Sequence, residues 1–163
     1  MIYIGIDNGV SGSISVIDPN GNIHYFKTPV IRSLNYTKTK AWLNRINVSV
    51  LKIILEPFTN DLSQPCICLL ERPMLNPGRF KASISALRAL EATLIVLEQL
   101  KIPYEYIDSK EWQKRLLPNG LEKEELKIAS TEVAKRLFPS IEIKKDGDAD
   151  SLLIAEYARI RTK

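Results

Sequence analysis

The stretch Met1-Ile2-Tyr3-Ile4-Gly5-Ile6-Asp7-Asn8-Gly9 opens the chain with an apolar run that ends abruptly on a carboxylate. A second apolar run, Cys66-Ile67-Cys68-Leu69-Leu70, ends in the same way on Glu71. Both runs read as buried strands, because continuous apolar segments of this length are typical of strands covered on both faces. If the two strands are neighbours, Asp7 and Glu71 come to lie side by side. The two runs therefore predict a sheet with an acidic pair at one edge.

A third acidic segment, Asp146-Gly147-Asp148-Ala149-Asp150, leads into an apolar helix. Carboxylates so far apart in sequence meet only in a folded cleft, where like charges repel unless a cation lies between them. Hard oxygen ligands favour Mg²⁺ or Mn²⁺. Asp146 and Asp150 are four residues apart and share a helix face if the helix begins early. We therefore take Asp7, Glu71, Asp146 and Asp150 as candidate catalytic and metal-binding residues, with Asp148 as a helix N-cap or a bystander.

Each acid also has a structural explanation. Asp-Asn-Gly is common turn material, so Asp7 can simply begin a turn. Glu71 can form an ion pair with Arg72 at the edge of a sheet. An acid in a first helical turn stabilises the helix dipole by about 0.3–1 kcal/mol, which accounts for Asp150 alone. Three acids within five residues exceed what capping requires.

Length and composition describe an ordinary globular protein. The 163 residues fit a single domain, 1–163, and 45% of them are hydrophobic and 26% charged. No apolar run approaches the roughly 20 residues that span a bilayer, and the N-terminus does not read as a secretion signal. We expect a cytoplasmic protein that contacts no membrane.

The cysteines and the histidine offer little chemistry. Cys66 and Cys68 alternate in a strand, where residues i and i+2 are poorly placed to form a disulfide, so we expect buried free thiols. His24 is the only histidine and lies in a predicted strand, which favours a structural or exposed side chain. A catalytic dyad built on histidine is thus nearly excluded.

The order of predicted elements gives an α/β fold. Three antiparallel strands come first, with a hairpin turn at Pro19-Asn20-Gly21-Asn22. The region 29–47 has no readable pattern. Further elements are expected as helices at 48–58, 80–100, 110–117, 121–138 and 148–161, and as strands at 66–70 and 102–107. The result is a mixed five-stranded sheet, three antiparallel strands followed by βα units, with helices on both faces. This is the ribonuclease H-like architecture.

Basic residues gather directly after Glu71. The stretch Arg72 to Leu90 holds Arg72, Arg79, Lys81 and Arg88 and no acid. A basic strip beside an acidic cluster suits a polyanion whose phosphate must approach a metal. The alternative is a solvated helix face.

Five segments, in order, resemble those of RuvC-type Holliday junction resolvases, especially the phage and poxvirus branch. They cover most of the chain outside 29–65. The segments are Ile4-Gly5-Ile6-Asp7-Asn8-Gly9 with Gly12-Ser13, Leu70-Glu71-Arg72-Pro73, Ile102-Pro103-Tyr104 with Trp112-Gln113-Lys114, Ala134-Lys135-Arg136-Leu137-Phe138-Pro139, and Asp146-Gly147-Asp148-Ala149-Asp150-Ser151-Leu152-Leu153-Ile154-Ala155.

The resemblance implies a nuclease whose metal ligands are Asp7, Glu71, Asp150 and a fourth acid nearby. In the phage and poxvirus branch that acid precedes a glycine, as Asp146 does here. In the bacterial form the last two carboxylates are three residues apart, which places Gly147 at the ligand position and leaves the choice between Asp146 and Asp148 open. The loop at 74–83 also departs from the bacterial pattern.

The implied reaction is hydrolysis of phosphodiesters in four-way junctions, leaving 5′-phosphate and 3′-hydroxyl ends. Two Mg²⁺ or Mn²⁺ ions per active site would activate water and stabilise the leaving oxygen. A junction has two-fold symmetry, so the resemblance implies a homodimer, with the helix at 80–100 as a possible interface. Phe80 is a candidate for stacking on an opened base, or else a core residue that begins this helix. The candidate DNA-binding residues are Arg72, Arg79, Phe80, Lys81 and Lys114.

Three other functions are weighed against junction cleavage. Asp7-Asn8-Gly9 with Ser11-Gly12-Ser13 resembles the phosphate loop of actin-like and sugar-kinase-like phosphotransferases, but 163 residues leave no room for their second domain. A junction- or RNA-binding module without activity is disfavoured because all the acids are present. A debranching nuclease for flaps, forks and replication intermediates keeps the chemistry and stays open.

Overall fold

The protein forms one mixed five-stranded sheet, and the computed structural model describes residues 1–59, 64–143 and 149–162. The strand order is β3-β2-β1-β6-β7. The first three strands pair antiparallel, whereas β6 is parallel to β1 and β7 is parallel to β6. The predicted sheet, with the first strand beside the fourth predicted one, is confirmed. The strands are β1 (Ile2–Asp7), β2 (Ser13–Ile17), β3 (Ile23–Lys27), β6 (Cys66–Glu71) and β7 (Tyr104–Ile107).

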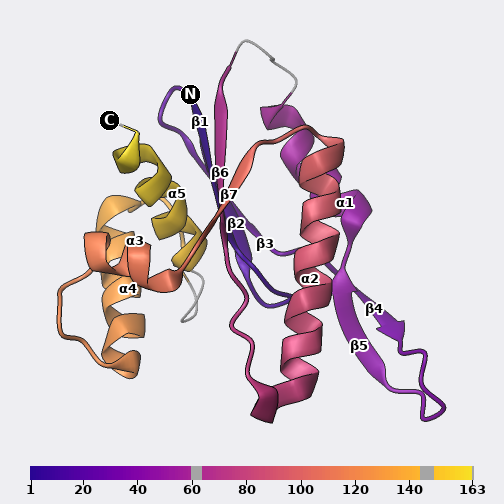
Figure 1. Ribbon diagram of the computed structural model, residues 1–163. Coiled ribbons are helices and arrows are strands. Elements are labelled where there is room, and N and C mark those ends of the chain that lie inside the picture. Colours follow the sequence, from indigo (N-terminus) through magenta and orange to yellow (C-terminus); the bar gives the residue numbers. More distant parts are fainter. Residues whose placement is uncertain (60–63, 144–148, 163) are drawn as a thin grey trace.

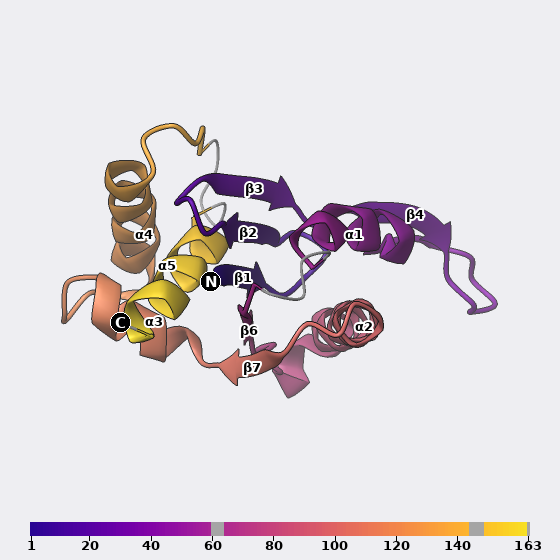
Figure 2. The ribbon, with the colours of Figure 1, turned by 90° about the horizontal axis from the view of Figure 1, so that it is seen from above.

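Helices cover both faces of the sheet, as predicted (Figures 1 and 2). Two apolar clusters lie between the layers, one on each face, and the alternating side chains of β1 and β6 contribute to both. On one face lie α1 (Val48–Leu55) and α2 (Phe80–Gln99), and on the other α3 (Ser109–Leu116), α4 (Lys123–Leu137) and α5 (Asp150–Arg161).

Local signals account for several boundaries. Asn47 caps α1 through its side-chain oxygen, which accepts from Val50 N at 3.2 Å. The predicted helix at 48–58 divides into α1 and a 3-10 turn over Glu56–Phe58, because Pro57 cannot continue an α-helix. The turn between β2 and β3 contains Gly21 at φ 84°, as the Asn-Gly pair predicts.

The region 29–47 holds an antiparallel hairpin that its sequence did not predict. Strand β4 (Val30–Leu34) pairs with β5 (Trp42–Ile46) in a separate two-stranded sheet. Figure 1 shows the hairpin extending away from the main sheet beside α2. Most of its side chains are exposed, so the strands lack the alternation of buried and exposed residues that marks a strand covered on one face.

Small boundary errors remain. The strand predicted at 102–107 begins at Tyr104, and the helix predicted at 121–138 spans Lys123–Leu137. Helix α5 begins at Asp150 with Ala149 in the N-cap position, two residues after the start predicted at about 148. Asp148, predicted as an N-cap or a bystander, lies outside the described residues. No helix within the described ranges combines the length and apolar character that a bilayer-spanning segment requires.

Candidate active site

The candidate site lies at the edge of the sheet where β1 and β6 end. Asp7 is the last residue of β1 and Glu71 the last residue of β6. The strands are parallel and Ile6 pairs with Leu70, so the two carboxylates follow directly at the same edge. Asp150 is the first residue of α5, which packs against β1, β2 and β6. The structure thus brings together three of the four predicted acids. Asp146, like the alternative Asp148, lies outside the described residues.

The three carboxylates act on one another electrostatically. The pKa of Asp7 is raised well above its ordinary value, first by burial and then by the charges of Glu71 and Asp150. Burial and then the charge of Asp150 raise the pKa of Glu71 to about 7. Burial raises the pKa of Asp150 to about 6. Strongly raised carboxyl pKa values are common among residues of functional sites.

The donor set fits a hard divalent cation in kind, because all three side chains offer carboxylate oxygens. Within the described residues, however, no group of three or more His, Cys, Asp or Glu side chains is arranged so that it could hold a metal ion by itself. Asp7, Glu71 and Asp150 therefore lie within range of one another's charge without forming a complete ligand set. Asp146 and Asp148 are the remaining candidate donors.

A buried serine cluster holds α5 against the sheet next to Asp150. The hydroxyl of Ser13 donates to Ser151 Oγ at 2.7 Å, and Ser15 Oγ lies 2.7 Å from the same atom. All three side chains are fully buried. Ser13 also pairs with Asp7 across β1 and β2, so the cluster joins the two acid-bearing elements. This cluster was not predicted, since alternate serines in a strand carry no recognisable motif.

We expect Ser151→Ala to lower the free energy of unfolding by about 1–3 kcal/mol, because it leaves two buried hydroxyls without their shared partner. Urea unfolding measures the change. Replacing Ser13, Ser15 and Ser151 together by alanine should cost less than the sum of the three single changes, since no hydroxyl then stays buried without a partner. Additive losses would show that the hydroxyls do not act as one cluster.

Trp112 lies against the acidic edge from α3. Its side chain is 0% exposed, and its indole N–H lowers the pKa of Glu71, although the contact lacks the geometry of a standard hydrogen bond. A capping box between Asp108 and Glu111 fixes the start of α3. Trp112 belongs to one of the five segments that resemble RuvC-type resolvases, but its position beside Glu71 was not predicted.

Asn8 connects the loop after Asp7 to α2. Its Nδ2 donates to the carbonyl oxygen of Ala86 at 3.3 Å. Its buried Oδ1 has no hydrogen-bond partner among the described residues. This connection was also missed, because it joins two elements that are distant in sequence.

The predicted DNA-binding residues flank the site on both faces of the sheet. Arg72 follows Glu71 and is exposed, with its guanidinium 3.5 Å from Asp108 rather than paired to Glu71. Arg79, Phe80 and Lys81 lie exposed where α2 begins, and Lys114 lies exposed on α3 across the sheet. Phe80 is 69% exposed, so the alternative that it is a core residue is wrong.

The raised pKa of Glu71 predicts a pH-dependent stability. Its carboxyl titrates near 4.5 in an ordinary setting and near 7 in the folded protein, so between these values the folded state holds a proton that the unfolded state releases. With chelator present, the free energy of unfolding should therefore fall as pH rises from about 4.5 to about 7. Asp150 adds to this loss from about 4 to about 6.

We expect Glu71→Gln to flatten this dependence and to be more stable than wild type at pH 8 by about 1–3 kcal/mol. Urea unfolding at pH 5 and pH 8 with chelator tests this. Glu98→Gln, on the exposed end of α2, is the matched control and should follow the wild-type curve. Equal pH slopes for wild type and Glu71→Gln would contradict the assigned pKa.

Comparison with known proteins bears on the fold. No protein-family model matches the chain, and no curated protein sequence does. Solved structures do match over nearly the full length. Thermus thermophilus RuvC in complex with Holliday junction substrate has a TM-score of 0.59 and 14% sequence identity, with 99% of this chain and 97% of that chain covered. A second T. thermophilus RuvC structure has a TM-score of 0.52 and 14% sequence identity, with 99% of this chain and 98% of that chain covered. This chain therefore has the ribonuclease H-like fold of RuvC.

Proposed function

We propose that the protein is a metal-dependent endodeoxyribonuclease that nicks four-way (Holliday) junctions. One observation carries the proposal. Three carboxylates with raised pKa values, from two neighbouring strand ends and a helix start, meet at one edge of a fold shared with T. thermophilus RuvC, which has been solved with Holliday junction substrate. The fold alone does not determine function, so the proposal rests on this site.

Asp7, Glu71 and Asp150, together with Asp146 or Asp148, would hold Mg²⁺ or Mn²⁺, with two ions per active site. When bound, such ions supply Lewis-acid stabilisation of the phosphate and lower the pKa of water. The carboxylates would bind and orient the cations, and the cations would offset the repulsion between the carboxylates. Burial raises the pKa of Glu71 to about 7 and that of Asp150 to about 6, so protons compete with the cation for these carboxylates at acidic pH, and cleavage should increase from acidic towards neutral pH.

The nucleophile is water rather than a side chain. Burial raises the pKa of the Cys66 thiol to about 11 and that of Cys68 well above its ordinary value, so both stay protonated and unreactive. His24 contacts Asp18 and the ring of Phe58, on β3 rather than at the acidic edge. We infer hydrolysis to 5′-phosphate and 3′-hydroxyl ends.

Branched DNA would lie across the acidic edge. Arg72, Arg79 and Lys81 on one flank and Lys114 on the other offer phosphate contacts, and the exposed ring of Phe80 offers a stacking surface. We infer a homodimer, since a four-way junction has two equivalent strands to cut. Exposed apolar side chains on α2, such as Leu87, support this helix as the interface. Membership of the phage and poxvirus branch and a cytoplasmic location stay predictions from the sequence.

The test is cleavage of labelled four-way junction, flap, fork and linear duplex DNA with Mg²⁺ or Mn²⁺. Paired symmetric nicks in the junction alone would support a resolvase. Cutting of every branched form but not of duplex would identify a general debranching nuclease instead. Junction binding without cleavage in either metal would leave only a binding module, and the nuclease proposal would fail.

A further inference from the structure

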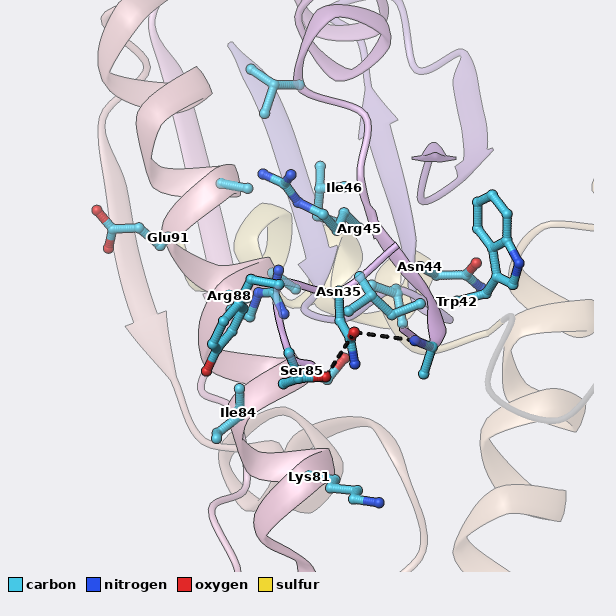
Figure 3. A pocket seen from close by; sticks show the side chains of 18 of the residues that line it. Asn35, Trp42, Asn44, Arg45, Ile46, Lys81, Ile84, Ser85, Arg88 and Glu91 are labelled. Atoms are coloured by element: carbon cyan, nitrogen blue, oxygen red, sulfur yellow. Dashed lines mark hydrogen bonds between the residues drawn. The ribbon is translucent and has the colours of Figure 1, made fainter. Parts of the chain in front are cut away.

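The β4–β5 hairpin and α2, from Phe80 to Ile95, enclose a groove of about 630 Å³ (Figure 3). Trp42, Asn44 and Arg45 line it from the hairpin, and Ile84 and Arg88 line it from α2. Its floor is apolar, with the buried side chains of Ile46 and Ala89. A groove of this size is comparable to pockets that bind small organic groups.

The groove begins beside the candidate active site. Val10, three residues after Asp7, belongs to its lining. The bond from Asn8 Nδ2 to Ala86 O holds the loop after β1 against the same part of α2. The loop after β1 therefore connects the end of the strand that carries Asp7 with the lining of the groove.

The charge around the groove suits a polyanion. Residues 19–55, which include the hairpin, hold no Asp or Glu, and residues 72–90 hold none either. Among the described residues of the lining, Glu91 is the one acid, against three cations. The basic residues of 19–55 are Lys27, Arg32, Lys38, Lys40, Arg45 and Lys52. The cations in the lining are Arg45, Lys81 and Arg88.

Exposed aromatic rings accompany the basic residues of the hairpin and of α2. Trp42 is 58% exposed, and the guanidinium carbon of Arg32 lies 5.1 Å from the centre of its ring. Tyr36 and Phe80, also in the lining, are both strongly exposed. Exposed aromatic rings beside basic side chains are typical of surfaces that bind single-stranded nucleic acid, where bases stack and phosphates pair with cations.

We propose that this groove binds an unpaired segment of a DNA strand next to the branch point, with bases against Trp42 and phosphates against Arg45, Lys81 and Arg88. The inference rests on the proposed function. Unpaired DNA fits better than duplex, because base faces inside a duplex are covered by their neighbours. The proposed dimer contact at Leu87 lies outside the lining of the groove. Within the groove, unpaired DNA also fits better than a second copy of this chain, since a two-fold contact there would bring the basic residues of both copies together.

The two tryptophans make a direct test possible. Trp42 is exposed, whereas Trp112 is fully buried, so a base that stacks in the groove quenches only Trp42. The experiment titrates single-stranded oligothymidylate into the Glu71→Gln protein, which prevents cleavage, and follows tryptophan fluorescence together with the anisotropy of labelled oligonucleotide. We expect saturable quenching.

Two substitutions of Trp42 separate the stacking of a base from the fluorescence signal that reports it. Trp42→Phe should abolish the quenching but keep most of the affinity, because phenylalanine still stacks. Trp42→Ala should weaken binding about 5- to 100-fold. Log affinity falls as log salt concentration rises, and Arg45→Ala and Arg88→Ala should each make this slope shallower by about 0.7. Ile128→Ala, which removes an equally exposed apolar side chain on α4, should change nothing.

The outcomes distinguish this inference from the proposed function. One outcome is that oligothymidylate leaves Trp42 fluorescence unquenched and binds Trp42→Ala as tightly as the parent protein, while four-way junctions still bind. In that case the groove does not hold DNA and the nuclease proposal stands. If Trp42→Ala changes sedimentation of the protein instead of DNA affinity, the groove is an interface between copies. If no DNA binds at all, the proposed function fails and this inference fails with it.

Discussion

Glu71→Gln lowers the single-turnover rate of junction cleavage by about a thousandfold or more at saturating Mg²⁺, while junction affinity stays near wild type. The amide has the shape of the carboxylate but lacks the negative charge that binds a cation. Catalytic cations contribute several kcal/mol to such reactions, and each 1.36 kcal/mol is tenfold in rate. Asp7→Asn and Asp150→Asn should behave alike, because all three carboxylates belong to one cluster.

The measurement needs a control for general effects of losing a charge. Glu98→Gln removes one exposed carboxylate at the far end of α2 and should cleave at the wild-type rate. Binding is measured by anisotropy with Ca²⁺ in place of Mg²⁺. If Glu71→Gln cleaves within tenfold of wild type, Glu71 is not part of the active site. Asp146→Asn and Asp148→Asn, compared in the same assay, identify the fourth acid by the larger loss.

Gly5→Ala destabilises the fold by about 3 kcal/mol or more, because a methyl group at this position collides with main-chain atoms of α5. The added carbon would overlap the carbonyl oxygen of Ser151 and the nitrogen of Ala155. Neither strand β1 nor α5 can move away without exposing the apolar cluster between them. For a protein of this size the melting temperature should fall by roughly 6–12 °C or more.

Gly78→Ala is the matched control. A methyl group there would meet only the end of the Asn76 side chain at 3.3 Å, so the melting temperature should stay within a few degrees of wild type. Gly5→Ala should also lose cleavage, since the helix that it displaces begins with Asp150. An unchanged melting temperature for Gly5→Ala would mean that helix and strand are not in close contact.

The main sheet and most of the acidic cluster were predictable from the sequence, because the signals were local and strong. Two apolar runs each ended on an acid, and parallel neighbouring strands place such residues at one edge. The β4–β5 hairpin was not predictable, since its strands have no covered face to impose an alternating pattern. A periodic pattern of apolar residues marks the face of an element that is buried, and an exposed hairpin shows no such pattern.

The supporting contacts of the site were missed for a different reason. Trp112 lies beside Glu71, and Ser151 binds Ser13 and Ser15, only through the tertiary fold. Such pairs carry no spacing rule, because nothing in the sequence relates a serine on a strand to one on a distant helix. The predicted fourth acid, Asp146 or Asp148, falls outside the described residues and stays a prediction.

The serine cluster has a consequence for folding kinetics. Ser13 and Ser151 are 138 residues apart, so the contact closes a loop that includes almost the whole chain. Contacts of such long sequence separation form late, after the loop-closure entropy has been overcome by other interactions. Asp150 reaches Asp7 and Glu71 in the same event. An intermediate in which α5 is still undocked would lack a complete acidic cluster, so we expect cleavage to require the docked helix.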